Sequence, residues 1–281
     1  MKILGTPVSL EQLAATPAPA HTSTWKPLSF HAVVVFLMTM CERAGLTIES
    51  ADFGLNKTGQ RFIGYFTFAA PTTAGGLTIP GSSALPSLMV RGCYDKAWAW
   101  SLAIGARMVC CQNGIFSTDG VKMLRRNTLN VWGDFRNLAT SAVDDVFPAY
   151  RRSLEAAQMF SSIACGELRG AALVGVARYK GLLTPTQETV VMTDWQTPRH
   201  PEFAARNLWS LYNCGTEGLK SGAFDNAAER HSGWHAYLSE RAAIDATAAT
   251  VAQIAAPAPD SGSMLATPAD AGRIAAARII G

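Results

Sequence analysis

The chain has 281 residues, of which 48% are hydrophobic and 16% are charged, and its formal net charge is +3. This composition is that of a globular protein with a sizeable core, and it excludes an intrinsically disordered chain. So small a net charge does not by itself indicate a nucleic-acid partner. The segment from Arg91 to Arg152, however, contains nine basic and five acidic residues. This central segment therefore carries the whole positive excess.

The first part of the chain predicts an arm followed by a core helix. Residues 1–24 contain several Ser, Thr and Pro residues with little periodicity, so we expect a mobile N-terminal arm. Ser29 is a candidate cap and Gly45 a stop signal, which predicts a helix through Ala44. The apolar run 32–41 inside this helix is about half the length of a membrane span, so no membrane association is expected.

The next part predicts antiparallel strands. Residues 46–55 and 61–69 have strand character and flank a Gly-containing turn, which is typical of a hairpin. Residues 71–86 are rich in Gly, Ser, Thr and Pro and predict a long loop. Residues 88–116 then hold two apolar runs around a polar turn. In the second run, four large side chains alternate with smaller ones and are expected on one strand face: Trp98, Trp100, Leu102 and Ile104.

From Asn127 onward, the apolar spacing becomes helical. Thr184, Pro185 and Gln187 together form a good helix start signal. After about Ala243, Ala and Thr dominate and proline interrupts, which predicts a tail with at most transient helix. Helices are expected over 127–147, 151–164 and 168–183, from 184, and from Pro201 to Lys220.

These elements predict an α+β fold in which an antiparallel sheet of four to five strands is followed by a set of covering helices. The expected organisation is a mobile arm over residues 1–24, a single α+β domain over 25–243, and an Ala- and Pro-rich flexible tail over 244–281.

The residues that commonly carry chemistry form few recognisable patterns. Six cysteines lie mostly in apolar runs without a CxxC pair, so we expect buried, reduced thiols in a cytoplasmic protein. His231 and His235 have a spacing that suits a metal, but Gly233 weakens the helix between them, and a solvated helix face is the favoured interpretation. The sequence contains no phosphate-binding loop and no nucleophile elbow. No catalytic residue, metal or cofactor is therefore assigned.

Three short motifs carry a family resemblance: Tyr94-Asp95, Cys111-Gln112-Asn113-Gly114, and Trp209-x-x-x-Asn213-x-x-Thr216-Glu217. They resemble phage and plasmid-related proteins that carry the domain of unknown function numbered 932. The resemblance covers roughly residues 25–240, departs from the family pattern at Gly92-Cys93 and Asn127, and implies a mobile-element origin. It suggests a polar site made by Tyr94, Asp95, Asn113, Asn213 and Thr216. For the turn residues, hydrogen bonding to their own backbone is the favoured alternative.

The basic and aromatic residues of the centre carry the leading functional hypothesis. A groove that binds a single strand needs cations for phosphates and flat side chains for bases. The aromatic candidates are Phe62, Tyr65, Trp98 and Trp100, although aromatic residues also dominate ordinary cores. The predicted nucleic-acid-binding cations are Lys122, Arg125, Arg126, Arg151 and Arg152.

The order of strands and then a long helix resembles the core of single-strand annealing proteins of the Rad fifty-two type. The leading hypothesis is therefore a phage- or prophage-derived protein that binds single-stranded nucleic acid in replication or recombination, as a homo-oligomer in the host cytoplasm.

Two alternatives stay open. The first is a non-enzymatic accessory factor that binds a host protein, for host takeover or for blocking defence, through an exposed apolar patch. The second is an enzyme acting at the polar residues of the family motifs, but this one lacks a recognisable nucleophile, general base or metal set.

Overall fold

The computed structural model describes residues 5–71, 83–108, 114–115, 121–123, 127–220 and 227–255. The chain divides into two compact units, residues 1–242 and residues 243–281. The first unit contains the sheet, seven of the eight described α-helices and the eighth as far as Ala242. Of the second unit, the structure describes residues 243–255, which are helical. No helix in the described ranges is long and apolar enough to cross a membrane.

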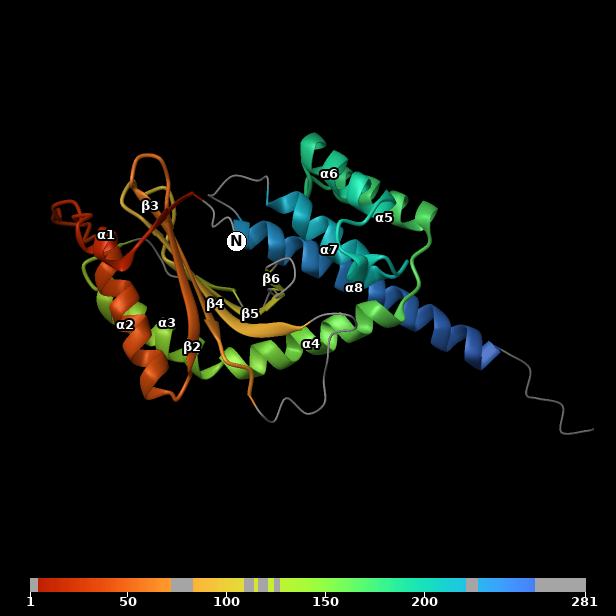
Figure 1. Cartoon of the computed structure of the whole chain (residues 1–281), viewed down its shortest axis with the longest axis horizontal. Coiled ribbons are helices and arrows are strands. Elements are labelled where there is room, and N and C mark those ends of the chain that lie inside the picture. The colour runs from red at the N-terminus through yellow and green to blue at the C-terminus, as the bar shows by residue number, and fades with distance from the viewer. Residues whose placement is uncertain are drawn as a thin grey trace, which may run out of the picture. The chain divides into compact units, whose positions relative to one another are not determined.

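One antiparallel sheet organises the first unit (Figure 1). Within the described residues it has seven strands, in the order β1-β2-β3-β4-β5-β6, and β7 also pairs with β5. Only the four strands from β2 to β5 are long, so the expected α+β fold with four to five principal strands is confirmed. The bounds are β1 Thr6–Val8, β2 Ile48–Leu55, β3 Arg61–Phe68, β4 Ala84–Cys93, β5 Ser101–Met108, β6 Gly114–Ile115 and β7 Val121–Met123.

The helices follow the sheet in sequence, apart from the first two. Their bounds are α1 Leu10–Ala14, α2 Phe30–Arg43, α3 Val131–Asp144, α4 Val146–Ser162, α5 Glu167–Tyr179, α6 Pro185–Gln196, α7 Leu208–Leu219 and α8 Ala227–Ala255. Helices α2 and α3 pack together, and α4 packs against β4 and β5 (Figure 1).

Local signals account for the elements from α2 to β3. The hydroxyl of Ser29 accepts a hydrogen bond from the Ala32 N–H, as expected of a helix cap, and Gly45 takes a positive φ of 71° just after α2. In the β2–β3 turn, Gly59 has a φ of 69°, a backbone conformation that residues with a side chain rarely adopt. The predicted helix and hairpin are confirmed.

The β4–β5 hairpin departs from the expected pattern at one position. Trp100, Leu102 and Ile104 are buried together in the core, as predicted. Trp98 is not among them, because β5 begins only at Ser101 and Trp98 lies in the preceding turn. The ring of Trp98 instead contacts Arg91, with its centre 4.8 Å from the guanidinium carbon. The expectation that all four side chains share one strand face was wrong for Trp98.

One face of the sheet is apolar along its whole length. Every second residue of β5 points to this face. The first two of these residues belong to one core cluster and the next two to another. Leu102 and Ile104 pack with residues of α2 and α3, whereas Ala106 and Met108 pack with residues of α4 to α8. Helices α2, α3 and α4 contact the sheet. The opposite face of β3 to β5 is buried as well, because every residue of β5 and all but one residue of β3 and of β4 are buried.

The N-terminal arm is more ordered than predicted. Residues 6–8 form β1, which pairs with β2, and residues 10–14 form α1 with a complete capping box between Ser9 and Gln12. Leu13 of α1 is fully buried. Pairing with β2 and burial of Leu13 stabilise elements that are too short to be stable alone. This corrects the interpretation of residues 5–15 as part of a mobile arm.

Two prolines act differently in the helical part. Pro148 was expected to lie between two helices. Helix α3 instead ends at Asp144, and Pro148 lies in the first turn of α4. A backbone N–H in the first turn has no partner within the helix, so its absence in proline costs nothing there. Pro201 opens a single 3-10 turn, Pro201–Phe203, rather than the long helix expected. Helix α7 begins later, because Asn207 caps it by accepting the Ser210 N–H.

The last described helix extends beyond the residue at which the tail was expected to begin. The unit boundary after Ala242 lies where the tail was expected to begin. Helix α8, however, continues through Ala255. Residues 256–281 lie outside the part of the chain that the structure describes.

Candidate nucleic-acid interface

A groove at the start of α4 contains two of the predicted nucleic-acid contacts. We call it the α4 groove. It encloses about 420 Å³ and is lined by Pro71, Phe147, Pro148, Tyr150, Arg151, Arg152 and Leu154. Cations and aromatic rings thus meet in one open hollow, which is the combination that a single strand needs.

The buried side chains at the start of α4 hold the groove in place against the sheet. The Tyr150 hydroxyl donates a hydrogen bond of 2.9 Å to the carbonyl of Ala84 in β4. Arg152 is partly restrained, since its guanidinium lies 3.0 Å from Asp145. Arg151 and the ring of Phe147 remain exposed. The groove therefore offers one exposed cation, one partly paired cation and one exposed flat ring.

The other three predicted cations do not join this groove within the described residues. The strand β7 pairs Lys122 with Leu102, near the first residue of β5. The groove lies near Met108, at the other end of β5, because Met108 pairs with the residue that binds Tyr150. Six residues of strand separate the two places, which is about 20 Å. Arg125 and Arg126 lie outside the described residues.

The predicted polar site does not assemble from its described members. Tyr94 is buried at the end of β4, where its hydroxyl accepts the Phe30 N–H at 3.1 Å and its ring stacks on Phe30. Burial raises the pKa of Tyr94. Its role is to attach α2 to the β4–β5 turn.

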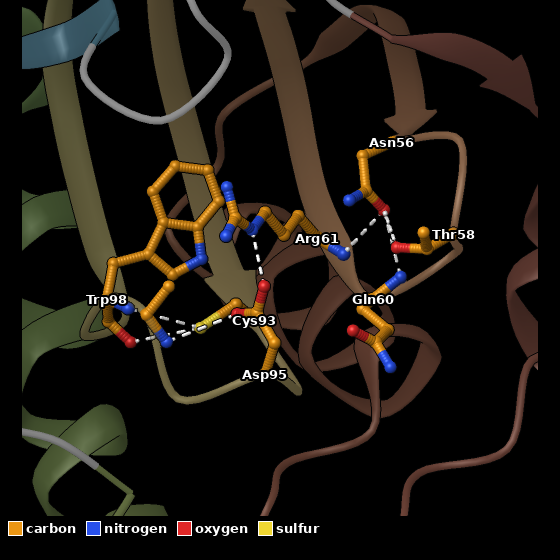
Figure 2. A network of polar contacts seen from close by, with 8 residues as sticks. Asn56, Thr58, Gln60, Arg61, Cys93, Asp95 and Trp98 are labelled. Carbon is orange, nitrogen blue, oxygen red and sulfur yellow. Dashed lines mark hydrogen bonds and ion pairs between the residues drawn. The ribbon is translucent and has the colours of Figure 1, made fainter.

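Asp95 lies in the β4–β5 turn, within the polar network that Figure 2 shows. Its carboxylate accepts hydrogen bonds from the Ala97 N–H at 3.1 Å and from the Arg61 Nε at 2.5 Å. Burial opposes its ionisation, but the bonds from Arg61, Ala97 and Cys93 outweigh that effect and keep the pKa of Asp95 below its usual range. The hydrogen bond from the Ala97 N–H to Asp95 is the bond to the local backbone that the sequence favoured for a turn residue.

Asn213 and Thr216 lie on α7, both fully buried. The Asn213 amide donates to the carbonyl of Trp209 and the Thr216 hydroxyl donates to the carbonyl of Asn213, so both bond their own helix. No hydrogen bond or ion pair in the described chain joins them to Tyr94 or Asp95. Asn113 lies outside the described residues. An enzymatic site at these residues therefore has no geometric support.

The second face of the sheet holds a set of arginines that sequence reasoning did not assign. We call it the arginine face, after Arg61 of β3, Arg91 of β4 and Arg107 of β5. Arg91 and Arg107 are 2% and 7% exposed. The sequence signal was present, since each is a charged residue inside an apolar strand, on the opposite side from the core residues.

Each arginine of this face has a carboxylate partner. Arg61 pairs with Asp95, Arg91 with Glu229 of α8, and Arg107 with Asp52 of β2. Two of the aromatic candidates also lie here: Arg107 contacts the ring of Tyr65, and Arg61 and Arg91 both contact the ring of Trp98 (Figure 2 shows Arg61 beside Trp98). The other two aromatic candidates, Phe62 and Trp100, are core residues and are not available to bases.

Of the two histidines, His235 has a packing role. His235 is only 8% exposed and its ring lies against Phe160 and Tyr212. The expectation of a solvated helix face was wrong for His235, because α8 packs this position against α4 and α7. Searched over the described residues, the chain shows no group of three side chains that could hold a metal ion.

The described cysteines are buried free thiols: Cys41, Cys93, Cys165 and Cys214. Cys110 and Cys111 lie outside the described residues. Burial raises the pKa of Cys41 and Cys214 to about 12, from an ordinary value of 9.0. A thiol in this environment is a poor nucleophile at neutral pH.

These thiols predict a loss of stability in alkali. The pKa of each thiol is higher in the folded than in the unfolded chain. The contribution of these thiols to the free energy of unfolding is therefore complete below about pH 9 and is lost as the pH rises toward 12. Each group contributes up to about 1.4 kcal/mol per pH unit in that window. Urea unfolding at several pH values would show a steady free energy up to about pH 9 and a fall above it. A Cys41→Ala, Cys214→Ala variant should fall less steeply, and an equal slope would contradict the assignment.

The chain is thus an α+β protein with an antiparallel sheet, a cationic groove at α4 and an arginine face on which Arg91 and Arg107 are buried. Comparison with protein-family models, with curated proteins and with solved structures finds no match for it. The family resemblance described above thus depends on its motif residues alone.

Proposed function

We propose that the protein binds single-stranded nucleic acid in the α4 groove, as a homo-oligomer that acts in replication or recombination of a phage or related mobile element. The observation that carries the proposal is the presence of Arg151, Arg152 and the exposed ring of Phe147 in one groove. The guanidinium groups would bind backbone phosphates and the ring would stack on a base. The motif resemblance supports the mobile-element setting.

Fluorescence anisotropy with a labelled single-stranded oligonucleotide at two salt concentrations tests the proposal. Wild-type protein should bind, and binding should weaken steeply with salt. Arg151→Ala combined with Arg152→Ala should reduce the slope of log K against log salt by about 1.4, because each phosphate contact contributes about 0.7. Phe147→Ala should weaken binding roughly tenfold and leave the slope unchanged.

Arg43→Ala is the matched control, since Arg43 is an exposed arginine in the last turn of α2 and does not line the groove. It should leave affinity and slope unchanged. An unchanged slope in the double variant would remove the groove from the proposal. The same assay on Arg125→Ala with Arg126→Ala tests two of the remaining predicted contacts.

A second candidate function is protein binding, and one observation favours it. Helix α5 exposes three large apolar side chains, with Leu168 86% and Tyr179 93% exposed and Val176 between them. Exposed apolar patches of this kind often mark protein contacts. Absence of oligonucleotide binding at low salt would make this the working hypothesis.

A further inference from the structure

Helix α5 is apolar on two opposite sides, one of which packs within the protein. Its residues 170–177 consist only of Gly, Ala, Leu and Val. On the packed side, Gly170, Val174 and Ala177 are buried. Helix α5 contacts α6, and Figure 1 shows this pair at the periphery of the helices. A helix that is hydrophobic all round is normally buried all round, so the composition of α5 indicates a second contact.

The other side of α5 exposes a row of residues with the spacing of a helix–helix contact. Leu168 is 86% exposed, Tyr179 93% and Val176 42%. Between the two ends, Ala172 and Gly175 are exposed as well. Positions 168, 172, 175 and 179 follow one another at intervals of four, three and four residues, the repeat that aligns side chains along a seam between two helices. We call these five residues the α5 stripe.

The α5 stripe is complementary to itself in an antiparallel pair. Residues eleven positions apart lie on the same side of a helix, about three turns from each other, so Leu168 and Tyr179 are the two ends of the stripe. A two-fold axis through its middle places Leu168 of each copy against Tyr179 of the other. The small Ala172 and Gly175 between them let the two helices approach closely.

The charges beside the stripe favour the same orientation. Glu167 and Arg178 are also eleven positions apart, so the two-fold axis brings Glu167 of each copy level with Arg178 of the other. On the opposite flank Arg169 comes level with Lys180, whose charge is offset by Glu240 at 3.8 Å. Antiparallel packing also sets the positive N-terminal end of each helix beside the negative C-terminal end of the other.

We propose that the α5 stripe is the interface of a homodimer, in which two copies of the chain pack α5 against α5 in antiparallel orientation. Burying the stripe in both copies removes on the order of 1,000 Å² of surface from water, about the lower limit of specific protein interfaces. The dimer therefore dissociates on dilution. As the contact of the proposed homo-oligomer, the interface rests on the proposed function, but self-association itself needs no nucleic acid.

Analytical ultracentrifugation of the full chain between about 1 and 100 µM tests the interface, since contacts of this size are weak. With rising concentration, the mass of wild type should change from that of one chain toward that of two. Leu168→Glu and Tyr179→Glu should each weaken the dimer roughly thirtyfold or more, because they bury a charge in the contact. Both residues are exposed in the single chain, so circular dichroism and the melting temperature of dilute protein should match wild type.

Leu129→Glu is the matched control, since Leu129 is 61% exposed and lies shortly before α3. It should dimerise like wild type. A wild-type chain that stays monomeric over the whole concentration range would overturn the proposal and leave the stripe to a different protein. Leu168→Glu and Tyr179→Glu variants that associate as wild type does would overturn it as well.

Exchange of the flanking charges tests the antiparallel orientation. Glu167→Lys should weaken the dimer, and so should Arg178→Glu, which also removes the ion pair with Glu188 at 3.6 Å. The double variant should dimerise about as well as wild type, because each intermolecular pair then has its charges reversed. A double variant that dimerises no better than the two single variants would contradict this orientation.

The oligonucleotide assay separates this interface from the proposed function. A wild-type chain that dimerises through α5 but binds no strand keeps the interface and removes the proposed function. A monomeric wild type that binds the strand keeps strand binding and removes the interface.

Discussion

Replacement of Gly215 by alanine is expected to destabilise the protein by roughly 3 kcal/mol, although alanine is the better helix former. Gly215 lies in α7, and a Cβ atom there would be 2.1 Å from the ring of Trp234 in α8. The ring cannot move aside easily, because Trp234 is fully buried and its indole N–H donates to the carbonyl of Tyr212. Helices α7 and α8 would have to separate.

Gly175→Ala provides the matched control. Gly175 is also inside a helix, α5, but a Cβ atom there would meet nothing within 4 Å. This variant should be about 1 kcal/mol more stable than wild type, because alanine loses less backbone entropy. Urea unfolding followed by circular dichroism measures both. A Gly215→Ala variant as stable as wild type would show that α7 and α8 are not packed as described.

Among the described residues, the contact between glycine and tryptophan recurs twice more. A Cβ atom at Gly170 would lie 2.4 Å from Trp195, and one at Gly92 would lie 2.5 Å from Trp100. The first contact joins α5 to α6, and the second joins β4 to the residue just before β5. In each case the missing side chain leaves room for an indole ring.

Phe30→Ala is expected to cost about 4 kcal/mol, the range found for removing a fully buried aromatic ring. Phe30 is the first residue of α2 and is fully buried. Its ring stacks on Tyr94 with centroids 3.8 Å apart and on Phe62 at 5.1 Å, and it meets Trp100 edge-on at 6.0 Å. Its removal leaves a cavity between α2, the sheet and the β4–β5 turn.

Phe36→Ala is the control in the same helix, because Phe36 is only half-buried and packs against Trp132 and Phe135 of α3. It should cost less than half as much. Denaturant midpoints at constant m-value give both numbers. Equal losses would mean that the ring cluster around Phe30 is not the main attachment of α2.

The sequence could name candidate site residues but not which of them lie together in space. The charge pattern named Arg151 and Arg152 as candidates, and the structure places both with Phe147 in the lining of the α4 groove. The sequence had no means to show that Lys122 lies about 20 Å along β5 from them. Nor could it show that Tyr94 and Asn213 serve different parts of the core, since that depends on how the helices pack.

The sequence by itself determined the elements whose signals act within about four residues. Ser29 caps α2, Gly59 permits the turn of the first hairpin, and Thr184 with Gln187 forms the capping box of α6. These hydrogen bonds and dihedral preferences are local, so the residues that cause them adjoin the structure they produce.

Only the tertiary structure decided what depends on residues far apart in the chain. The strand β1 forms because it pairs with β2. Trp98 lies outside the core because β5 begins at Ser101, three residues later than the alternating pattern predicted. Arg91 and Glu229 are separated by 138 positions, and no pattern in the sequence links them. Their pairing is a property of the packed fold, because it requires the sheet and α8 to be placed before either charge can be buried.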